Sequence, residues 1–157
     1  MTDAYLDSAI IVKLYVSESN SQDAIQLVDD CEAPYCLTEW QALEVRNAIR
    51  LKAFRKEITS AEMSQSIAAF EHDIVTGRWQ RPVYAVGAIE ERANELSAIH
   101  SAIIGCRTLD IIHVAAACII GAKKFLTFDA RQGAMAKQAG LMAIPFNGHS
   151  KKSRLRP

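Results

Sequence analysis

Residues 106–129 read C-R-T-L-D-I-I-H-V-A-A-A-C-I-I-G-A-K-K-F-L-T-F-D. This stretch is the strongest indicator of the fold in the sequence. A polar helix start that carries Asp110 leads into a helix that is apolar on nearly every side. A short apolar strand over residues 125–128 follows and ends on Asp129. An apolar helix beside a short apolar strand is typical of a parallel sheet covered by helices. Because polar groups in such folds collect at the carboxyl ends of the strands, the stretch predicts two carboxylates at one sheet edge.

The rest of the chain shows the same alternation of strands and helices. We predict strands over residues 4–6, 34–37, 125–128 and 142–146, with 79–84 as an edge strand or ordered loop, and helices over residues 9–16, 23–31, 39–54, 61–76, 86–104, from 109 onward and 130–139. This alternation predicts an α/β fold whose central parallel sheet is covered on both faces. No internal repeat or linker is visible, so we expect one domain over residues 1–147. Residues 148–157 form a basic tail, for which a solvated terminus is favoured over a contact with phosphate.

The composition excludes several classes of protein. Half of the 157 residues are hydrophobic, and 18 basic residues balance 18 acidic ones, so neither disorder nor a global attraction to polyanions is expected. The cysteines form no C-x-x-C pair, which favours reduced core thiols over a zinc site: Cys31, Cys36, Cys106 and Cys118. No signal-peptide pattern is visible, and the longest apolar run, residues 111–122, is too short to span a bilayer. We therefore expect a cytoplasmic protein without a membrane partner.

Three aspartates stand at chain turns beside the predicted sheet. Asp7 and Asp129 each follow a predicted strand, and Asp110 lies in the first turn of its helix, after Thr108 as the expected N-cap. Taken alone, each has a structural interpretation. Aspartate is favoured as a helix N-cap, and an acid in the first turn complements the helix dipole.

Glu44 is more informative than the aspartates. On a helical wheel for residues 39–54, Glu39, Arg46 and Arg50 share one side, which we interpret as the solvent face, and Glu44 projects to the opposite side. A carboxylate that points to the covered side needs a partner or a cation. The wheel therefore predicts a functional Glu44 and an ordinary surface acid at Glu39.

Carboxylates from separate elements are thus expected to converge at one edge of the sheet, as catalytic groups and metal ligands: Asp7, Glu44, Asp110 and Asp129. Clustered carboxylates repel one another, and a divalent cation removes that penalty. An all-oxygen donor set favours Mg²⁺ or Mn²⁺ over zinc. Such a site suits phosphodiester hydrolysis, because the cation lowers the pKa of a bound water and neutralises charge on the leaving oxygen.

Neighbouring polar residues have open roles. The hydroxyls of Ser8 and Thr127 could orient a carboxylate or satisfy nearby backbone groups. For His113, a buried structural histidine that donates to the backbone is favoured over a general base. Arg107 could meet an RNA phosphate or balance the acidic cluster.

The motifs around the four acids resemble a known family. They read Y-L-D-S-A at Asp7, E-V-R-N-A-I from Glu44, R-T-L-D-I-I-H-V-A-A-A at Asp110 and F-L-T-F-D ending on Asp129. Together they are similar to the acidic motifs of the PIN-domain family, most closely the VapC-type ribonuclease toxins of prokaryotic toxin–antitoxin pairs. The resemblance implies a three-layer α/β/α fold and a Mg²⁺- or Mn²⁺-dependent endoribonuclease that acts on RNA. It also implies a homodimer that is neutralised by a VapB-like antitoxin.

Other functions fit the motifs less well. A receiver-type phosphoacceptor needs two adjacent acids after the first strand, and a D-x-D phosphatase needs a second aspartate at residue 9, whereas Asp7 stands alone. Some relatives carry a further acid soon after the fourth motif, where this chain reads A-R-Q, so the number of metal ions stays open. A PIN nuclease of RNA maturation and a non-catalytic PIN scaffold that binds RNA or protein remain as alternatives.

Overall fold

The computed structural model describes residues 3–145, and their elements follow the predicted alternation. They are β1 (Ala4–Leu6), α1 (Ser8–Tyr15), α2 (Ser21–Asp29), β2 (Tyr35–Cys36), α3 (Glu39–Phe54), α4 (Ser60–Val75), β3 (Trp79–Gln80), α5 (Ala88–Ile104), α6 (Thr108–Ile119), β4 (Lys124–Thr127), α7 (Ala130–Gln138) and β5 (Met142–Pro145). The bounds of β1 and α3 are those predicted, and most other bounds shift by one or two residues. The expected end of the last strand at residue 146 and the basic tail lie outside the described residues.

The predicted parallel sheet is divided in two. The central sheet has the strand order β1-β4-β5, with Tyr5 opposite Phe125 and Leu126 opposite Ile144, and both pairings are parallel. The strands β2 and β3 form a separate two-stranded parallel sheet. The prediction of a central parallel sheet is confirmed, and β2 and β3 lie outside that sheet. Proline offers no N–H group to a strand ladder, and the prolines that flank β2 and β3 keep both strands short.

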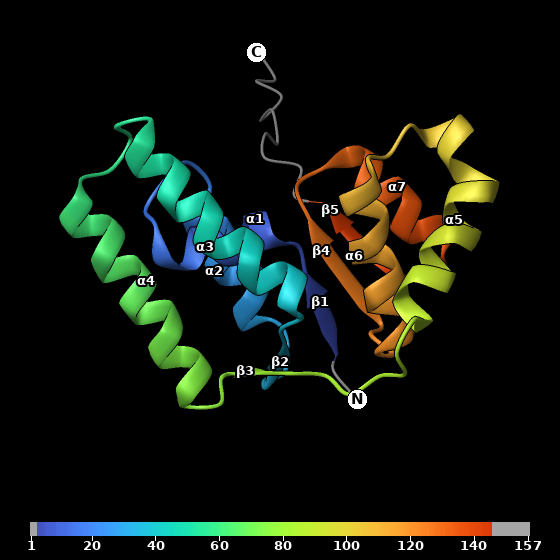
Figure 1. Cartoon of the computed structure of the whole chain (residues 1–157), viewed down its shortest axis with the longest axis horizontal. Helices are drawn as coiled ribbons and strands as arrows, with labels where there is room; N and C mark the ends of the chain where they lie inside the picture. Colours follow the sequence, from blue (N-terminus) through green and yellow to red (C-terminus); the bar gives the residue numbers. More distant parts are fainter. Residues whose placement is uncertain (1–2, 146–157) are drawn as a thin grey trace, which may run out of the picture.

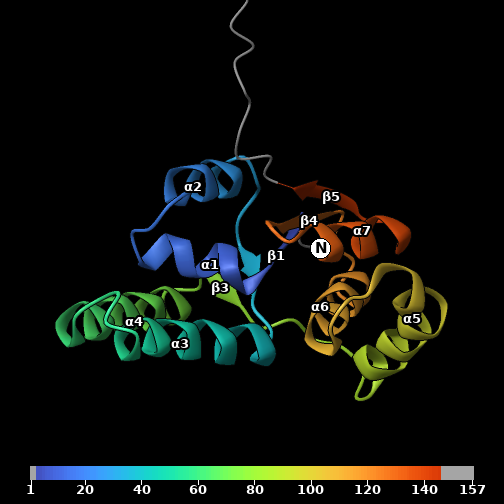
Figure 2. The ribbon, with the colours of Figure 1, turned by 90° about the horizontal axis from the view of Figure 1, so that it is seen from above.

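Helices cover both faces of the central sheet, which gives the predicted three-layer α/β/α fold (Figure 1). Figure 2 shows α1, α2, α3 and α4 on one side of β1 and β4, and α5, α6 and α7 on the other. The strands supply alternate side chains to the two layers, because successive strand residues point to opposite faces. Leu6 and Leu126 pack into the core beneath α1–α4, whereas Tyr5 and Phe125 pack into the core beneath α5–α7.

The helix that carries Glu44 begins where the sequence indicates. The Thr38 hydroxyl accepts a hydrogen bond from the Gln41 N–H at 3.3 Å, and Gln41 Oε1 accepts one from the Thr38 N–H at 2.8 Å. This capping box confirms Thr38 as the N-cap of α3. Thr59 caps α4 in the same way, and Gly105 ends α5 with a φ of 73°.

None of the four cysteines, all of which lie within residues 3–145, forms a disulfide. Cys31 is buried, whereas Cys36, Cys106 and Cys118 are partly exposed, so the prediction of core thiols is right for Cys31 alone. Within residues 3–145, none of the helices combines the length and the apolar character that crossing a bilayer requires.

Candidate functional site

Two of the predicted acids leave the central sheet at the same edge. Asp7 follows β1 directly, and Asp129 follows β4 as the N-cap of α7. The two strands are parallel neighbours, and the Asp7 N–H donates to the Leu126 carbonyl at 2.9 Å. The carboxyl ends of β1 and β4 therefore lie side by side, as the sequence predicted.

Asp7 is the most enclosed of the four acids, with 8% of its surface exposed. The Thr127 hydroxyl lies 3.2 Å from Asp7 Oδ2, and the Ser8 hydroxyl lies 3.5 Å from Asp7 Oδ1. Of the two roles that the sequence left open for these hydroxyls, contact with a carboxylate is realised for both. Thr127 has the other role as well, because it accepts the Asp129 N–H at 3.0 Å.

The electrostatics of Asp7 link three of the elements. Burial raises the pKa of Asp7, and the charges of Glu44 and Asp110 raise it further. The charge of His113 and the hydrogen bond from Thr127 act in the opposite direction but do not cancel the effect of burial. Glu44 and Asp110 are therefore each close enough to Asp7 to disfavour its ionisation, which is the behaviour expected of neighbouring carboxylates.

Glu44 has a protein partner. Its carboxylate forms a hydrogen bond with His113 Nε2, and the opposite ring nitrogen, His113 Nδ1, lies 2.8 Å from the Tyr5 hydroxyl. Burial disfavours ionisation of Glu44, but the hydrogen bond and the charge of His113 outweigh burial and lower its pKa. The expectation that His113 donates to the backbone is wrong, because both partners of this buried ring are side chains.

Asp110 and Asp129 both accept backbone hydrogen bonds at the N-terminus of a helix. Asp110 Oδ2 accepts the Arg107 N–H at 3.2 Å, and Asp129 Oδ1 accepts the Arg131 N–H at 2.8 Å. The N-cap of α6 is Arg107, one residue before the expected Thr108. Each of these acids thus has the structural role that the sequence offered as the alternative to metal binding.

The Cys106 thiol interacts with both of these acids. Burial raises the pKa of the Cys106 thiol, and the charges of Asp110 and Asp129 raise it further. Asp110 therefore affects the pKa of Asp7 and also that of Cys106, to which Asp129 contributes as well. We refer to the four predicted acids, Asp7, Glu44, Asp110 and Asp129, as the row.

The side chains of the row do not form a compact metal-binding site in the described part of the chain. Among residues 3–145, no three His, Cys, Asp or Glu side chains are grouped tightly enough to hold a metal ion. The donor chemistry nevertheless fits a hard divalent cation, since all four predicted ligands are carboxylates from separate elements.

The helical wheel for α3 is right for the acids and wrong for part of its neighbours. Glu39 is exposed and pairs with Arg81, as expected of a surface acid. Arg46, assigned to the solvent face, is half-buried and contacts Glu71 of α4 at 2.6 Å. The difference arises because α4 packs on the Arg46 side of α3.

Sequence reasoning missed Tyr5 and Gln132. Tyr5 contacts His113, and Gln132 Oε1 lies 2.6 Å from the Thr127 hydroxyl, with both residues fully buried or nearly so. The one available signal was the spacing of Tyr5 and Asp7, because residues two apart on an extended chain share a face.

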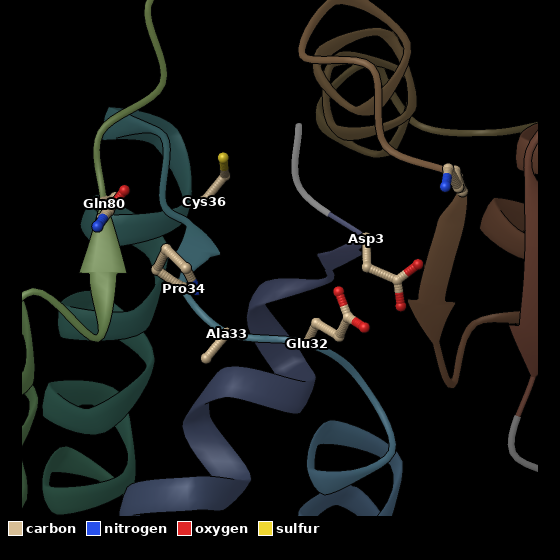
Figure 3. Close-up of a pocket in the computed structure, with 7 residues that line it drawn as sticks. Asp3, Glu32, Ala33, Pro34, Cys36 and Gln80 are labelled. Atoms are coloured by element: carbon tan, nitrogen blue, oxygen red, sulfur yellow. The ribbon is translucent and has the colours of Figure 1, made fainter.

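A hollow of about 320 Å³ lies elsewhere on the molecule (Figure 3). Its lining includes Asp3, Glu32, Pro34, Gln80 and Lys123, which lie at or near the starts of strands or at the separate two-stranded sheet. Asp3 and Lys123 precede the strands that Asp7 and Asp129 follow, so the hollow is at the opposite edge of the sheet from the acids. Figure 3 shows the carboxylates of Asp3 and Glu32 close to one another there.

Comparisons with known proteins agree with the motifs. No family model matches the sequence. The chain is 28% identical over 144 residues to Ribonuclease VapC45 of Mycobacterium tuberculosis (strain CDC 1551 / Oshkosh) and, equally, to Ribonuclease VapC49 of Mycobacterium tuberculosis (strain ATCC 25618 / H37Rv). Each alignment covers 90% of this chain and 94% of the relative.

A solved structure shares the fold. The chain matches the crystal structure of FitAcB from Neisseria gonorrhoeae with a TM-score of 0.63 and 16% identity, over 90% of this chain and 96% of that one. Both kinds of relative are matched over nearly their whole length. The resemblance predicted from the four acidic motifs is confirmed: the chain is similar to VapC-type ribonucleases over nearly its whole length, and it has the fold of a solved PIN-domain structure.

Proposed function

We propose that this chain is a metal-dependent endoribonuclease that hydrolyses RNA and acts as the toxin of a toxin–antitoxin pair. The observation that carries the proposal is the buried Asp7 carboxylate, whose pKa is raised by burial and by the charges of Glu44 and Asp110. Such repulsion is relieved when a cation binds. The two curated relatives, both named as VapC ribonucleases, support the same function.

Asp7, Glu44, Asp110 and Asp129 would hold Mg²⁺ or Mn²⁺. When bound, the cation would supply a lowered pKa for a water molecule and neutralise charge on the leaving oxygen. The hydroxyls of Thr127 and Ser8, which lie 3.2 Å and 3.5 Å from the Asp7 carboxylate, would fix its orientation for this role. We place the RNA backbone along the row of acids, where the cation offsets their negative charge.

The arginines beside the row provide phosphate contacts. Arg107 and Arg131 are exposed at the starts of α6 and α7, the helices that carry Asp110 and follow Asp129. Helix N-termini favour anions, and guanidinium groups bind phosphate in a fixed geometry. These two side chains would hold the phosphates on either side of the bond that is cleaved.

A VapB-like antitoxin is the proposed partner of α3 and α4. The outer face of α3 exposes large apolar side chains, with exposed fractions of 59% for Leu43 and 82% for Phe54. Exposed apolar patches of this kind mark interaction sites, and a basic segment of the antitoxin would neutralise the nearby acids. On the opposite layer, Ile99 and Ile103 of α5 are also exposed, which supports a homodimer. We propose that the complex acts in the cytoplasm.

A non-catalytic RNA-binding scaffold is the second candidate. The specific observation in its favour is that the carboxylates of residues 3–145 are not grouped as a closed metal cage. Each of the two outer acids, Asp110 and Asp129, also has a helix-capping role that would preserve it without catalysis.

Cleavage of total cellular RNA by the purified, antitoxin-free chain separates the two candidates. Reactions contain Mg²⁺ or Mn²⁺, or EDTA, and are repeated with Asp7→Asn and with Asp29→Asn, which changes an exposed aspartate of α2. Discrete fragments that disappear with EDTA and with Asp7→Asn alone would support the nuclease, and their mapped ends would identify the RNA. Absence of cleavage by a folded chain with either metal would favour the scaffold.

A further inference from the structure

A chain of hydrogen bonds runs from the central sheet to Glu44. Tyr5 lies on β1, His113 on α6 and Glu44 on α3, so the contacts connect the two helical layers through the sheet. Tyr5 is fully buried and His113 is 1% exposed. A polar pair enclosed to this degree is held in one arrangement by its surroundings, because an unpaired polar group would be costly there.

The hydrogen positions follow from the acceptor at the end of this chain. An ionised carboxylate only accepts hydrogen bonds, so His113 Nε2 must carry a hydrogen toward Glu44. On a neutral ring, Nδ1 then accepts the hydrogen of the Tyr5 hydroxyl; on a charged ring, Nδ1 donates to the Tyr5 oxygen instead. The bond to Glu44 is the same in both states, so the position of Glu44 does not depend on the protonation of the ring.

The bond to His113 leaves Glu44 beside Asp7. Ser8 lowers the pKa of Glu44, and its hydroxyl lies 3.5 Å from Asp7 Oδ1, so Ser8 is a neighbour of both carboxylates. His113 contacts one oxygen of the Glu44 carboxylate, and the charge of this carboxylate raises the pKa of Asp7. Glu44 therefore stands beside a carboxylate that repels it, and His113 is the group that holds it there.

We propose that Tyr5 and His113 form a positioning pair, in which Tyr5 orients the His113 ring and the ring holds the Glu44 carboxylate toward Asp7 as a pre-arranged metal ligand. This inference rests on the metal site of the proposed function. Hydrogen bonds to a metal-ligating side chain fix its orientation, and their removal typically weakens metal binding about 10–100-fold. Both residues are buried away from solvent, so both would act through Glu44.

Two substitutions of His113 separate positioning from packing. In His113→Gln, the side-chain amide reaches the former place of Nε2 and keeps a donor for Glu44. In His113→Asn, the shorter amide reaches only the former place of Nδ1, so it can meet Tyr5 but not Glu44. Tyr5→Phe removes the hydroxyl and keeps the ring that stacks on Phe125. His100→Asn and Tyr84→Phe, at partly exposed positions outside this hydrogen-bonded chain, are the matched controls.

Binding of Mn²⁺ to the metal-free full chain, followed by electron paramagnetic resonance, is the readout, with thermal unfolding measured beside it. We expect His113→Asn to weaken Mn²⁺ binding about 10–100-fold, and His113→Gln and Tyr5→Phe to weaken it less. Both controls should bind as the unsubstituted chain does. Unchanged Mn²⁺ affinity in His113→Asn would overturn the proposal. It would also be overturned if His113→Asn and His113→Gln lost affinity equally and both had a lowered unfolding temperature, because the loss would then reflect packing.

The same experiment distinguishes this inference from the proposed function. If the unsubstituted chain binds Mn²⁺ in a manner that depends on His113 but cleaves no RNA, the positioning pair is supported and the nuclease is refuted. If the unsubstituted chain binds no Mn²⁺, the positioning pair is overturned. Should His113→Asn fail to fold, Tyr5→Phe decides: a folded Tyr5→Phe chain with unchanged affinity overturns the pair.

Discussion

The hydroxyl of Thr127 joins the ends of the two neighbouring strands: it lies 3.2 Å from Asp7 Oδ2 and accepts the Asp129 N–H at 3.0 Å. A third contact, to Gln132 Oε1 at 2.6 Å, competes for the single hydroxyl hydrogen. Because Thr127 and Gln132 are both buried, water cannot replace these contacts at low cost. One hydroxyl therefore helps to orient a predicted metal ligand and the start of α7 together.

We expect Thr127→Val to destabilise the fold by about 1–3 kcal/mol, because it leaves buried polar partners without a hydrogen bond. The substitution keeps the size of the side chain, so the effect reports the hydroxyl. Urea unfolding measures it, with Thr76→Val as the control, since the Thr76 hydroxyl contacts only carbonyls of its own helix at an exposed position. Equal effects of the two substitutions would show that the Thr127 hydroxyl has no special role.

The stability of the metal-free chain should depend on pH through Asp7. Burial, together with the charges of Glu44 and Asp110, raises the pKa of Asp7 above its unfolded value of 3.8. The folded state therefore binds a proton more tightly than the unfolded state, and this contribution to stability is complete below the unfolded pKa and is lost as pH rises through the folded pKa. At neutral pH the ionised Asp7 therefore lowers the free energy of unfolding.

Asp7→Asn removes this charge, so in EDTA we expect it to be more stable than the unsubstituted chain near pH 8, with a smaller difference at an acidic pH below the folded pKa of Asp7. Urea unfolding at both pH values measures the difference. Asp29→Asn, at an exposed position, should show no such trend. A stability difference between Asp7→Asn and the unsubstituted chain that stays constant with pH would contradict the raised pKa.

The parts of the fold that were predictable from sequence are set by local signals. The bounds of β1 follow from an apolar run that ends at Asp7, and those of α3 from the capping residue Thr38. The order of the acids along the chain likewise placed Asp7 and Asp129 at one edge, because parallel strands share their carboxyl ends.

The contacts of Glu44 were not predictable in the same way. Its partner His113 is 69 residues away in the sequence, and the partner of His113, Tyr5, is 108 residues away from it in the opposite direction. A helical wheel shows which side chains share a face but not which helix packs on it, so Arg46 was assigned to solvent although α4 covers it. Tertiary packing decides these contacts, and no local pattern encodes it.

Glu44 and Glu39 form a matched pair on one helix. Glu44 contacts His113 and lies close to Asp7, whereas Glu39 is exposed and contacts Arg81. We expect Glu44→Gln to reduce RNA cleavage by on the order of 100-fold or more. Loss of a hydrogen-bond partner of a metal ligand typically costs up to about 100-fold, and loss of the ligand's charge should cost at least as much. Glu39→Gln should leave cleavage unchanged and alter stability by at most about 1 kcal/mol. Equal losses of activity in both variants would show that the functional side of α3 is misassigned.

Phe54 at the end of α3 tests the proposed antitoxin surface. Its side chain is 82% exposed, so Phe54→Asp should leave the unfolding temperature of the isolated chain nearly unchanged. If Phe54 is an anchor of the interface, the substitution should weaken binding of a VapB-like partner by about 2 kcal/mol, which is roughly 30-fold. Val86→Asp, at a fully exposed residue just before α5, is the control for added charge. Calorimetric titration with the co-expressed partner measures both, and equal weakening by the two substitutions would place the antitoxin elsewhere than on α3.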